Sequence, residues 1–309
     1  MEILRNPNYD FLGRTRLWVA ISLAMLLVGM AYIAKNGLHY GVEFQGGTQI
    51  IAKFRSRPEI DKVRSAAEKV SPGVVIQTYD DPALNQVLIR LGNTGEAAEL
   101  SHPARDVLKA LADQYGQNPV VESSSDIVGP IVGAELRRKA VMLTCLGLLF
   151  QLIYIAFRFN GAVWGTAATI AVLHDVMVTL GFLAICGYEI TLNVIAALLT
   201  LVGYSVNDTI VIFDRVRENL RQRRKEPLTK VINDSINQTL SRTLISSGTT
   251  FLSVLALYLL GGEVLRGFAF AMGVGIVVGT YSTIYIASPV VVWWQSISQK
   301  RPPTAKAAL

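Results

Sequence analysis

An aspartate lies beside an asparagine inside a long apolar segment of the sequence. Asn207 and Asp208 interrupt an apolar run that begins at Ile190, and the next such run is preceded directly by Arg242. A charged side chain inside lipid costs roughly 2.5 to 3.5 kcal/mol, and intramembrane acids commonly belong to proton relays or ion paths. The chemistry that these residue types indicate is reversible protonation of Asp208, balanced by the positive charge of Arg242.

Asp208 and Arg242 are placed symmetrically about the basic segment between their two apolar runs. Asp208 is 17 residues before Lys225, and Arg242 is 17 residues after it. In a symmetric antiparallel hairpin, the two side chains lie at the same depth and can neutralise each other. Symmetry fixes depth but not lateral distance, so a proton-responsive pair, a structural ion pair and a metal site all stay open. Because burying an ion pair is often no more stabilising than burying apolar residues, we favour the first interpretation.

Other polar residues inside the apolar runs extend the set of candidates. Ser246, Thr249 and Ser253 follow Arg242 at i+4, i+7 and i+11, on one helix face. His174 and Asp175 are adjacent, so on a helix they point about 100° apart and should not face one ligand together. His174 can therefore be interpreted either as a buried histidine with satisfied hydrogen bonds or as a member of a proton relay. The proton-coupling candidates are Asp208, Arg242 and Asn207, followed by Asp175, His174, Ser246 and Thr249.

The composition indicates that these candidates lie on membrane-spanning helices. Of 309 residues, 51% are hydrophobic and 17% are charged, against about 25% charged in soluble domains. Six apolar runs have about the length needed to cross the hydrocarbon. We therefore predict an α-helical polytopic membrane protein with six transmembrane helices. The runs are 17–34, 140–157, 162–186, 190–213, 243–260 and 268–294.

Basic residues predict the orientation, because Lys and Arg are enriched in short cytoplasmic loops. They gather near the amino terminus, after the fourth run and in the tail, so both termini are expected in the cytoplasm. These flanks, which favour anionic lipid, account for the +6 net charge and leave no indication of nucleic-acid binding. The predicted segments are a cytoplasmic amino terminus (1–16), helix 1 (17–34), an extracytoplasmic domain (35–138), helices 2 to 6 (139–298) with a basic cytoplasmic loop (215–235), and a cytoplasmic tail (299–309).

Residues 35–138 form the one sizeable region outside the apolar runs. Their pattern predicts strands at 48–54, 74–79, 85–91 and 119–124, with helices at 59–70 and 96–115. The order β-α-β-β-α-β is that of a ferredoxin-like α+β unit. No titratable cluster or phosphate-binding loop stands out in it, so we interpret it as a binding or moving domain. In the sixth run, Ala271, Gly275, Gly279, Thr283 and Ala287 form a small-residue ladder that predicts close helix packing.

Several motifs together resemble those of the SecF family of protein-export membrane subunits, over essentially the whole chain and in the same order. One departure is Glu43, where the family more often has Asp in its D-F-x-G-G stretch. The matching stretches are GVEFQGGT (41–48), VGPIVGAEL (128–136), HDV (174–176), GYSVNDTIVIFDRVREN (203–219), TLSRTLISSGTT (239–250) and GTYSTIYIAS (279–288).

The resemblance implies a fold related to the resistance-nodulation-division transporters and a place in the bacterial inner membrane. It implies a SecD partner that supplies a second six-helix half, the SecYEG channel, SecA acting indirectly, YajC, and a translocating preprotein. In that family the proton-motive force helps preproteins finish crossing, and the acid and arginine of the matching stretches are the proton-linked pair. Here these are Asp208 and Arg242. The resemblance also implies that the chain is not an enzyme and needs no cofactor or metal. Protons are the expected coupling ion.

Three other classes of protein are alternatives. An intramembrane aspartyl protease would use Asp175 and Asp208 as a dyad sharing one proton, but the G-x-G-D stretch associated with such enzymes is absent. The second is a proton-coupled small-solute exporter of the resistance-nodulation-division type. The external domain of this chain, at about 100 residues, is short for a domain that captures solutes. A purely structural assembly subunit is the third, and it would have no use for Asp208.

Overall fold

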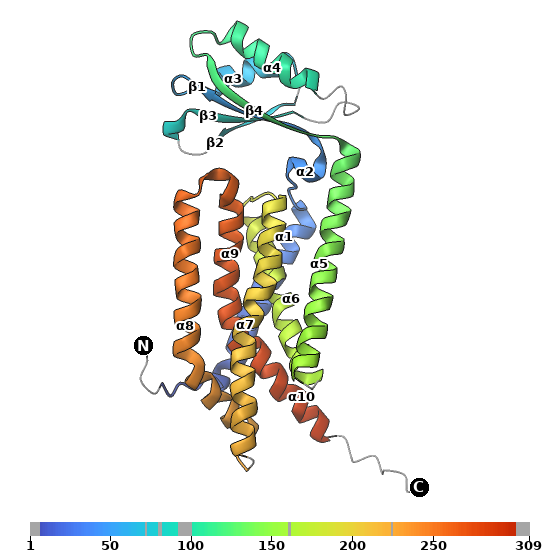
Figure 1. The fold of residues 1–309 in the computed structure, drawn as a ribbon, viewed down its shortest axis with the longest axis vertical. Coiled ribbons are helices and arrows are strands. Elements are labelled where there is room, and N and C mark those ends of the chain that lie inside the picture. The colour runs from blue at the N-terminus through green and yellow to red at the C-terminus, as the bar shows by residue number, and fades with distance from the viewer. Residues whose placement is uncertain are drawn as a thin grey trace.

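The computed structural model describes residues 7–71, 73–79, 82–91, 101–159, 162–223 and 225–300. A small α+β domain lies across one end of a bundle of long helices (Figure 1). The expected turn at 80–81, the first residues of the helix at 96–115, and the ends 1–6 and 301–309 fall outside the described residues.

The α+β domain follows the predicted element order, with one added short helix. Its elements are α2 (Val42–Gln45), β1 (Gly47–Phe54), α3 (Ile60–Glu68), β2 (Val75–Tyr79), a 3-10 turn (Pro82–Leu84), β3 (Gln86–Leu91), α4 (Ser101–Gln114) and β4 (Val120–Val128). The four strands form an antiparallel sheet in the order β2-β3-β1-β4. This split βαβ arrangement confirms the ferredoxin-like prediction.

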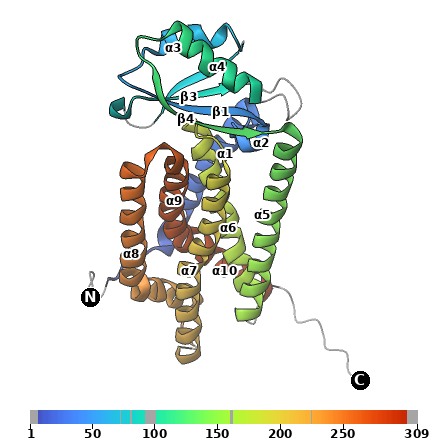
Figure 2. The same cartoon turned by 45° about the horizontal axis from the view of Figure 1, so that its top comes forward.

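Alternation along β1 explains which way the sheet faces. Ile50, Ala52 and Phe54 are buried and pack with Val63 of α3 and Val107 of α4. Because successive side chains of a strand point to opposite faces, the residues between them face the other way. The two helices cover the outer face of the sheet, and the other face looks toward the helix bundle (Figure 2). The underside of the sheet is therefore free to meet the loops of the membrane helices.

Six helical segments are long and apolar enough to cross a membrane, as predicted. They correspond to α1 (Thr15–Asn36), α5 (Pro130–Phe159), α6 (Ala162–Ile185), α7 (Leu192–Gln222), α8 (Leu228–Leu260) and α9 (Gly262–Ser282). A π-helical turn (Thr283–Ala287) joins α9 to α10 (Ser288–Lys300), and these three together make the sixth segment.

The segment expected as a basic loop at 215–235 is helical in most of its length. Helix α7 continues to Gln222, and α8 already begins at Leu228. The apolar runs of the sequence indicate only the part of each helix that lies in lipid. The backbone hydrogen bonds of α7 and α8 continue beyond those runs, so the helices are longer than predicted. Pairs one turn apart, such as Arg215 with Glu218 and Lys230 with Glu226, help to stabilise these helical extensions.

Three of the membrane helices form the centre of the bundle. In α6 and in the segment that contains α9, more than half of the residues of the most apolar stretch are buried, and in α7 half of them are. In α1 and α5 only 11% are buried. The small-residue ladder allows this packing, because Ala271, Thr283 and Ala287 are buried. A methyl group on Gly275 would meet the side chain of Leu201 on α7. Polar groups held between α6, α7 and α9 are thus shielded from lipid.

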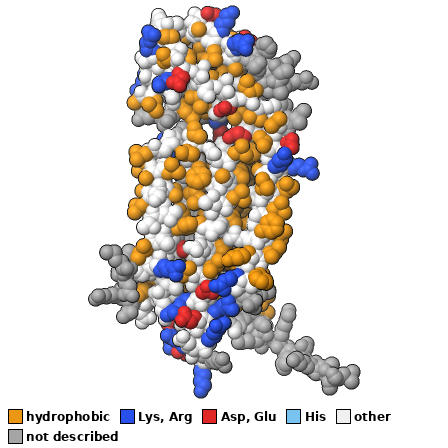
Figure 3. All heavy atoms as spheres, in the orientation of Figure 1, with side chains coloured by type: hydrophobic (Ala, Val, Ile, Leu, Met, Phe, Trp, Pro, Cys, Tyr) orange, Lys and Arg blue, Asp and Glu red, His pale blue; other side chains and the backbone are white. Residues whose placement is uncertain are grey.

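Charge is concentrated at the end of the bundle opposite the α+β domain. Lys and Arg side chains gather there below a belt of hydrophobic side chains (Figure 3). The start of the described chain is fixed at this end, because Asn237 of α8 bonds both the backbone N–H and the carbonyl oxygen of Tyr9, each at 2.9 Å. The carboxyl-terminal helix α10 lies at the same end (Figure 1).

Candidate functional site

Asp208 lies on α7 at the contact with α8. Its side chain is 4% exposed, and its Oδ2 accepts a hydrogen bond of 2.9 Å from the Ser247 hydroxyl. Ser247 is five residues, or about 7.5 Å along the helix axis, beyond Arg242 on α8. The acid is therefore buried at a helix interface and held there by a neutral donor.

Arg242 approaches Asp208 without a direct ion pair. Among the ion pairs between described residues, none joins these two side chains within 4.0 Å. Arg242 is exposed on α8, and its charge acts on Asp208 through space. The two groups interact electrostatically, yet they are not clamped together.

The other candidates on these two helices lie away from the carboxylate. Asn207 is exposed and lines a shallow groove between α5 and α7. The hydroxyls of Ser246 and Thr249 donate to carbonyl oxygens of their own helix, at 3.1 and 2.9 Å. Sequence reasoning missed Ser247, because it lies roughly 140° around the helix from Arg242. That Ser247 faces Asp208 depends on how α8 is rotated about its axis relative to α7, which the sequence does not give.

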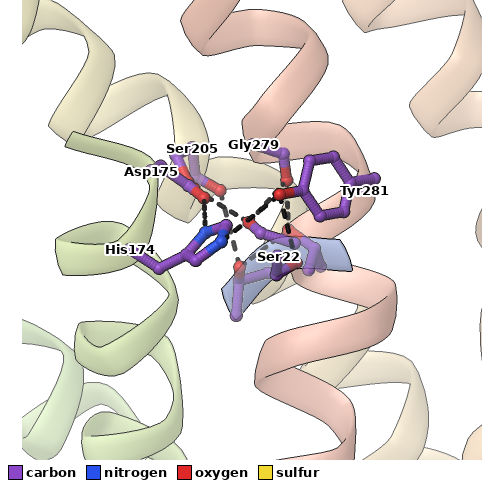
Figure 4. Close-up of polar contacts among 9 residues, drawn as sticks. Ser22, His174, Asp175, Ser205, Gly279 and Tyr281 are labelled. Carbon is purple, nitrogen blue, oxygen red and sulfur yellow. Dashed lines mark hydrogen bonds and ion pairs between the residues drawn. The ribbon is translucent and has the colours of Figure 1, made fainter. Parts of the chain in front are cut away.

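A second buried acid, Asp175 of α6, is surrounded by hydrogen-bond donors (Figure 4). Its side chain is 0% exposed. Oδ1 pairs with His174 Nδ1 at 2.9 Å, and Oδ2 accepts from the hydroxyls of Ser205 at 2.5 Å and Ser282 at 2.8 Å. Donors from α6, α7 and α9 thus replace the water that a carboxylate requires.

His174 and Asp175 meet, which differs from the expected divergence of adjacent helical residues. The imidazole ring extends far enough from the backbone to reach the carboxylate of the next residue. On its other side, His174 Nε2 lies 3.3 Å from the Tyr281 hydroxyl, which also receives a hydrogen bond from Ser22 of α1 at 3.2 Å. Ser22, Ser205, Tyr281 and Ser282 were not predicted, since their pairing depends on helix rotation.

Close helix packing makes room for this second network. A methyl group on Gly279 would lie 3.2 Å from the Ser205 Cβ and 3.5 Å from the Asp175 carboxylate. Directly after Ser282 the helix becomes π-helical, and buried Thr283 contacts Thr209 of α7 at 3.0 Å between hydroxyl oxygens. Since π-helical turns are frequent at functional sites, this interruption marks the region independently.

The two acids meet α7 one helical turn apart, on faces about 60° from each other. Ser205 of α7 bonds Asp175, and Asp208, three residues later on α7, bonds Ser247 of α8. Both carboxylates are held by hydroxyl groups, and neither has a Lys or Arg among its ion-pair partners within the described chain. This arrangement suits groups that gain and lose a proton, because a neutral donor does not lock a carboxylate in its charged form.

The chain matches two described protein families. Residues 107–297 match the family described as "Protein export membrane protein SecD/SecF, C-terminal", and residues 31–56 match the "SecD/SecF GG Motif". The "Protein translocase subunit SecF" of Calditerrivibrio nitroreducens is 40% identical over 97% of this chain and 99% of its own length.

Solved structures with a similar fold are of a longer protein. The chain superimposes on the crystal structure of SecDF from Thermus thermophilus with a TM-score of 0.82 and 38% identity, covering 94% of this chain and 39% of that one. A structure of SecDF in a super-membrane-facing form gives a TM-score of 0.70 at 40% identity, covering 96% of this chain and 40% of that one. With these matches across nearly its whole length, the chain belongs to the SecD/SecF family of protein-export membrane proteins.

Proposed function

We propose that this chain is the SecF-type subunit of the Sec protein translocase in the bacterial inner membrane. It works with SecD as a heterodimer and uses the proton-motive force to help preproteins finish crossing SecYEG after the stage driven by SecA. YajC is a further proposed partner, and protons are the coupling ion. The relative from Thermus thermophilus supports the SecD partnership, because it is a "Protein translocase subunit SecDF" of which this chain covers 39%.

The observation that carries this proposal is the environment of Asp208. The acid is buried, takes its hydrogen bond from a neutral serine, and senses Arg242 only through space. A purely structural ion pair would need direct contact to offset the cost of burying both charges. The looser arrangement favours an acid whose charge changes during the working cycle.

The energy available from protons fits a conformational role. One charge that crosses 100 mV releases about 2.3 kcal/mol. A typical coupling free energy between two linked sites is about 1 to 3 kcal/mol. A few protons are therefore sufficient to bias a two-state movement of the external domain.

The charge distribution supports the proposed orientation. The basic end of the bundle, with α10 and the Tyr9 region, faces the cytoplasm, in keeping with the enrichment of Lys and Arg in cytoplasmic segments. The α+β domain then lies outside the membrane, where an exported preprotein emerges.

The proposal is tested with membrane vesicles that contain this chain together with SecD, SecYEG and SecA. We expect late translocation intermediates to reach completion when a proton gradient is imposed. An ionophore that collapses the gradient should stop this completion, whereas ATP-driven initiation continues. Completion that is equally fast with and without the gradient would contradict proton coupling by this subunit.

An ion pair between the α+β domain and the membrane helices offers a second test. Arg90 of β3 pairs with Glu189, which lies in the connection between α6 and α7, beside a polar cleft of about 370 Å³. Burial lowers the pKa of the Arg90 guanidinium, the nearby Glu43 carboxylate raises it, and an arginine stays charged in either case. Its Nε is buried without a partner in the described part of the chain, so the contact is only partly satisfied and suited to release.

We expect Arg90→Gln to free the α+β domain from the membrane helices. Spin labels on β4 and on the α8–α9 turn should then report a broader and longer distance distribution than in the unchanged protein. The charge-swapped Arg90→Glu, Glu189→Arg variant should restore the narrow distribution. Lys53→Gln is the matched control, because the Lys53–Glu122 pair is exposed and lies within the domain. An unaltered distribution in Arg90→Gln would show that this contact does not hold the domain in place.

A further inference from the structure

A continuous chain of hydrogen bonds connects α1 to Asp175 through side chains alone (Figure 4). Ser22 Oγ lies 3.2 Å from the Tyr281 hydroxyl, which lies 3.3 Å from His174 Nε2, and His174 Nδ1 lies 2.9 Å from Asp175 Oδ1. Ser22 and Asp175 are buried, with 2% and 0% exposed. Such a chain has a direction, which follows from what each group can donate.

With Asp175 ionised and His174 neutral, every hydrogen in the chain has a place. A carboxylate can only accept, so His174 Nδ1 donates to it and Nε2 is left as an acceptor. The Tyr281 hydroxyl then donates to Nε2, and its oxygen accepts from Ser22. The second carboxylate oxygen is occupied by Ser205 and Ser282.

The same atoms accommodate one additional proton. If His174 becomes an imidazolium, both ring nitrogens donate, so Nε2–H points to the Tyr281 oxygen. The Tyr281 hydroxyl then turns its own hydrogen toward Ser22, and the chain reverses its direction without losing a contact. His174 and Asp175 become a buried ion pair, in which the negative charge already present balances the new positive charge.

Within the described residues, the hydrogen-bond network around His174 contains no Lys or Arg and no acid besides Asp175. In the described residues, α1 contributes Ser22 to the network, α7 contributes Ser205, and α9 contributes Tyr281 and Ser282. The titratable groups that face His174 from these helices and from its own are Tyr281 and Asp175. Asp208 lies one turn further along α7, where it bonds Ser247 of α8, and no hydrogen bond between described residues joins its side chain to this network.

The chain of hydrogen bonds ends at Ser22, near the basic end of the bundle. Ser22 is seven residues after the start of α1 at Thr15, or about 10 Å along the helix axis. The network also touches the element that carries Asp208, because Ser205 precedes it by one turn on α7. A change in the charge of the network is therefore felt by α7, the helix that carries Asp208 and that bonds Asp175 through Ser205.

We propose that Ser22, Tyr281, His174 and Asp175 form a second proton-carrying path, separate from Asp208, in which His174 gains and loses the proton. This inference rests on the proposed proton-coupled function. Tyr281 delivers the proton, Asp175 fixes the imidazole tautomer and balances its charge, and Ser22 connects the path to α1.

The protonation of His174 can be observed directly, because the chain has only three histidines. In a His39→Gln, His102→Gln background, ¹⁵N-labelled histidine reports His174 alone. In lipid bilayers we expect the neutral ring to be the Nδ1–H tautomer, as the bond to Asp175 requires, and the added proton to appear on Nε2 as an imidazolium after acidification. A ring that stays neutral after acidification, or an Nε2–H tautomer, would overturn the path.

Tyr281→Phe tests the transfer step. It removes the hydroxyl that bonds Nε2, and we expect gradient-dependent export to fall about tenfold while assembly with SecD is unchanged. Tyr285→Phe is the matched control, since Tyr285 stacks on Trp18 and no hydrogen bond of its hydroxyl is found in the described chain. Equal export by the two variants would reject the path. The titration of His174 does not depend on export, so failure of this path and failure of the proposed function give different results.

Discussion

Replacing Asp208 with asparagine is expected to abolish the part of preprotein export that depends on the proton gradient. Asparagine has nearly the same shape, and its carbonyl oxygen can still accept the hydrogen bond from Ser247. It cannot take up or release a proton. Export in vesicles should therefore fall to the level seen with an ionophore, at least about tenfold below the gradient-driven rate, as expected when an essential proton-transfer group is lost.

The interpretation depends on variants that separate charge from structure. Asp214→Asn is the matched control: this acid is on the same helix but pairs with Arg158 at the surface, and export should be unchanged. Arg242→Met should reproduce the Asp208→Asn defect, because the arginine senses the same acid. The double variant should be no worse than either single variant, and additive defects would argue against one coupled unit. Unchanged export in Asp208→Asn would leave the acid a structural role only.

The fold and the burial of Asp208 could be predicted from the sequence, because both follow from the free energy of placing each residue type in lipid or in water. Apolar runs of membrane length predict six helices, and the cost of charge in lipid singles out Asp208. Alternating and helical periodicities give the ferredoxin-like domain. Each of these features depends on local composition or on distance along the chain.

The partners of the two acids could not be predicted, because they depend on how each helix is rotated about its axis. Ser246 and Ser247 are both serines next to each other on α8, and only the second faces Asp208. Ser22 and Tyr281 are 259 residues apart, and nothing in their local sequence pairs them. The π-helical turn after Ser282 also shifts the register of every later side chain, which a regular helical wheel does not anticipate.

The second large effect is expected at the crossing of α1 and α6, where two glycines meet. A methyl group on Gly29 would lie 2.8 Å from the Gly181 Cα, well inside van der Waals contact. Both helices run away from the basic end, and Ser22 and His174 each lie seven residues before the crossing. The close approach therefore places Ser22 at the level of His174.

Gly29→Ala should force α1 and α6 apart and lower the stability of the folded protein. Overpacking of this kind costs about 1 to 3 kcal/mol, which corresponds to a fall of roughly 3 to 10 °C in the melting temperature measured in detergent. Gly203→Ala is the matched control, because nothing lies within 4 Å of its added methyl group and alanine favours a helix. That variant should melt at or above the temperature of the unchanged protein.

Gly181→Ala should give the same fall as Gly29→Ala, because either methyl group separates the same two backbones. The two changes should not add, since the first already opens the space that the second requires. Separation of α1 also withdraws Ser22 from Tyr281, so the ¹⁵N signals of the His174 ring should change in both variants, whereas they should stay unaltered in Gly203→Ala. A melting temperature unaffected by either alanine would mean that α1 and α6 do not pack at backbone contact, and α1 would then have no fixed place from which to complete the hydrogen-bond chain.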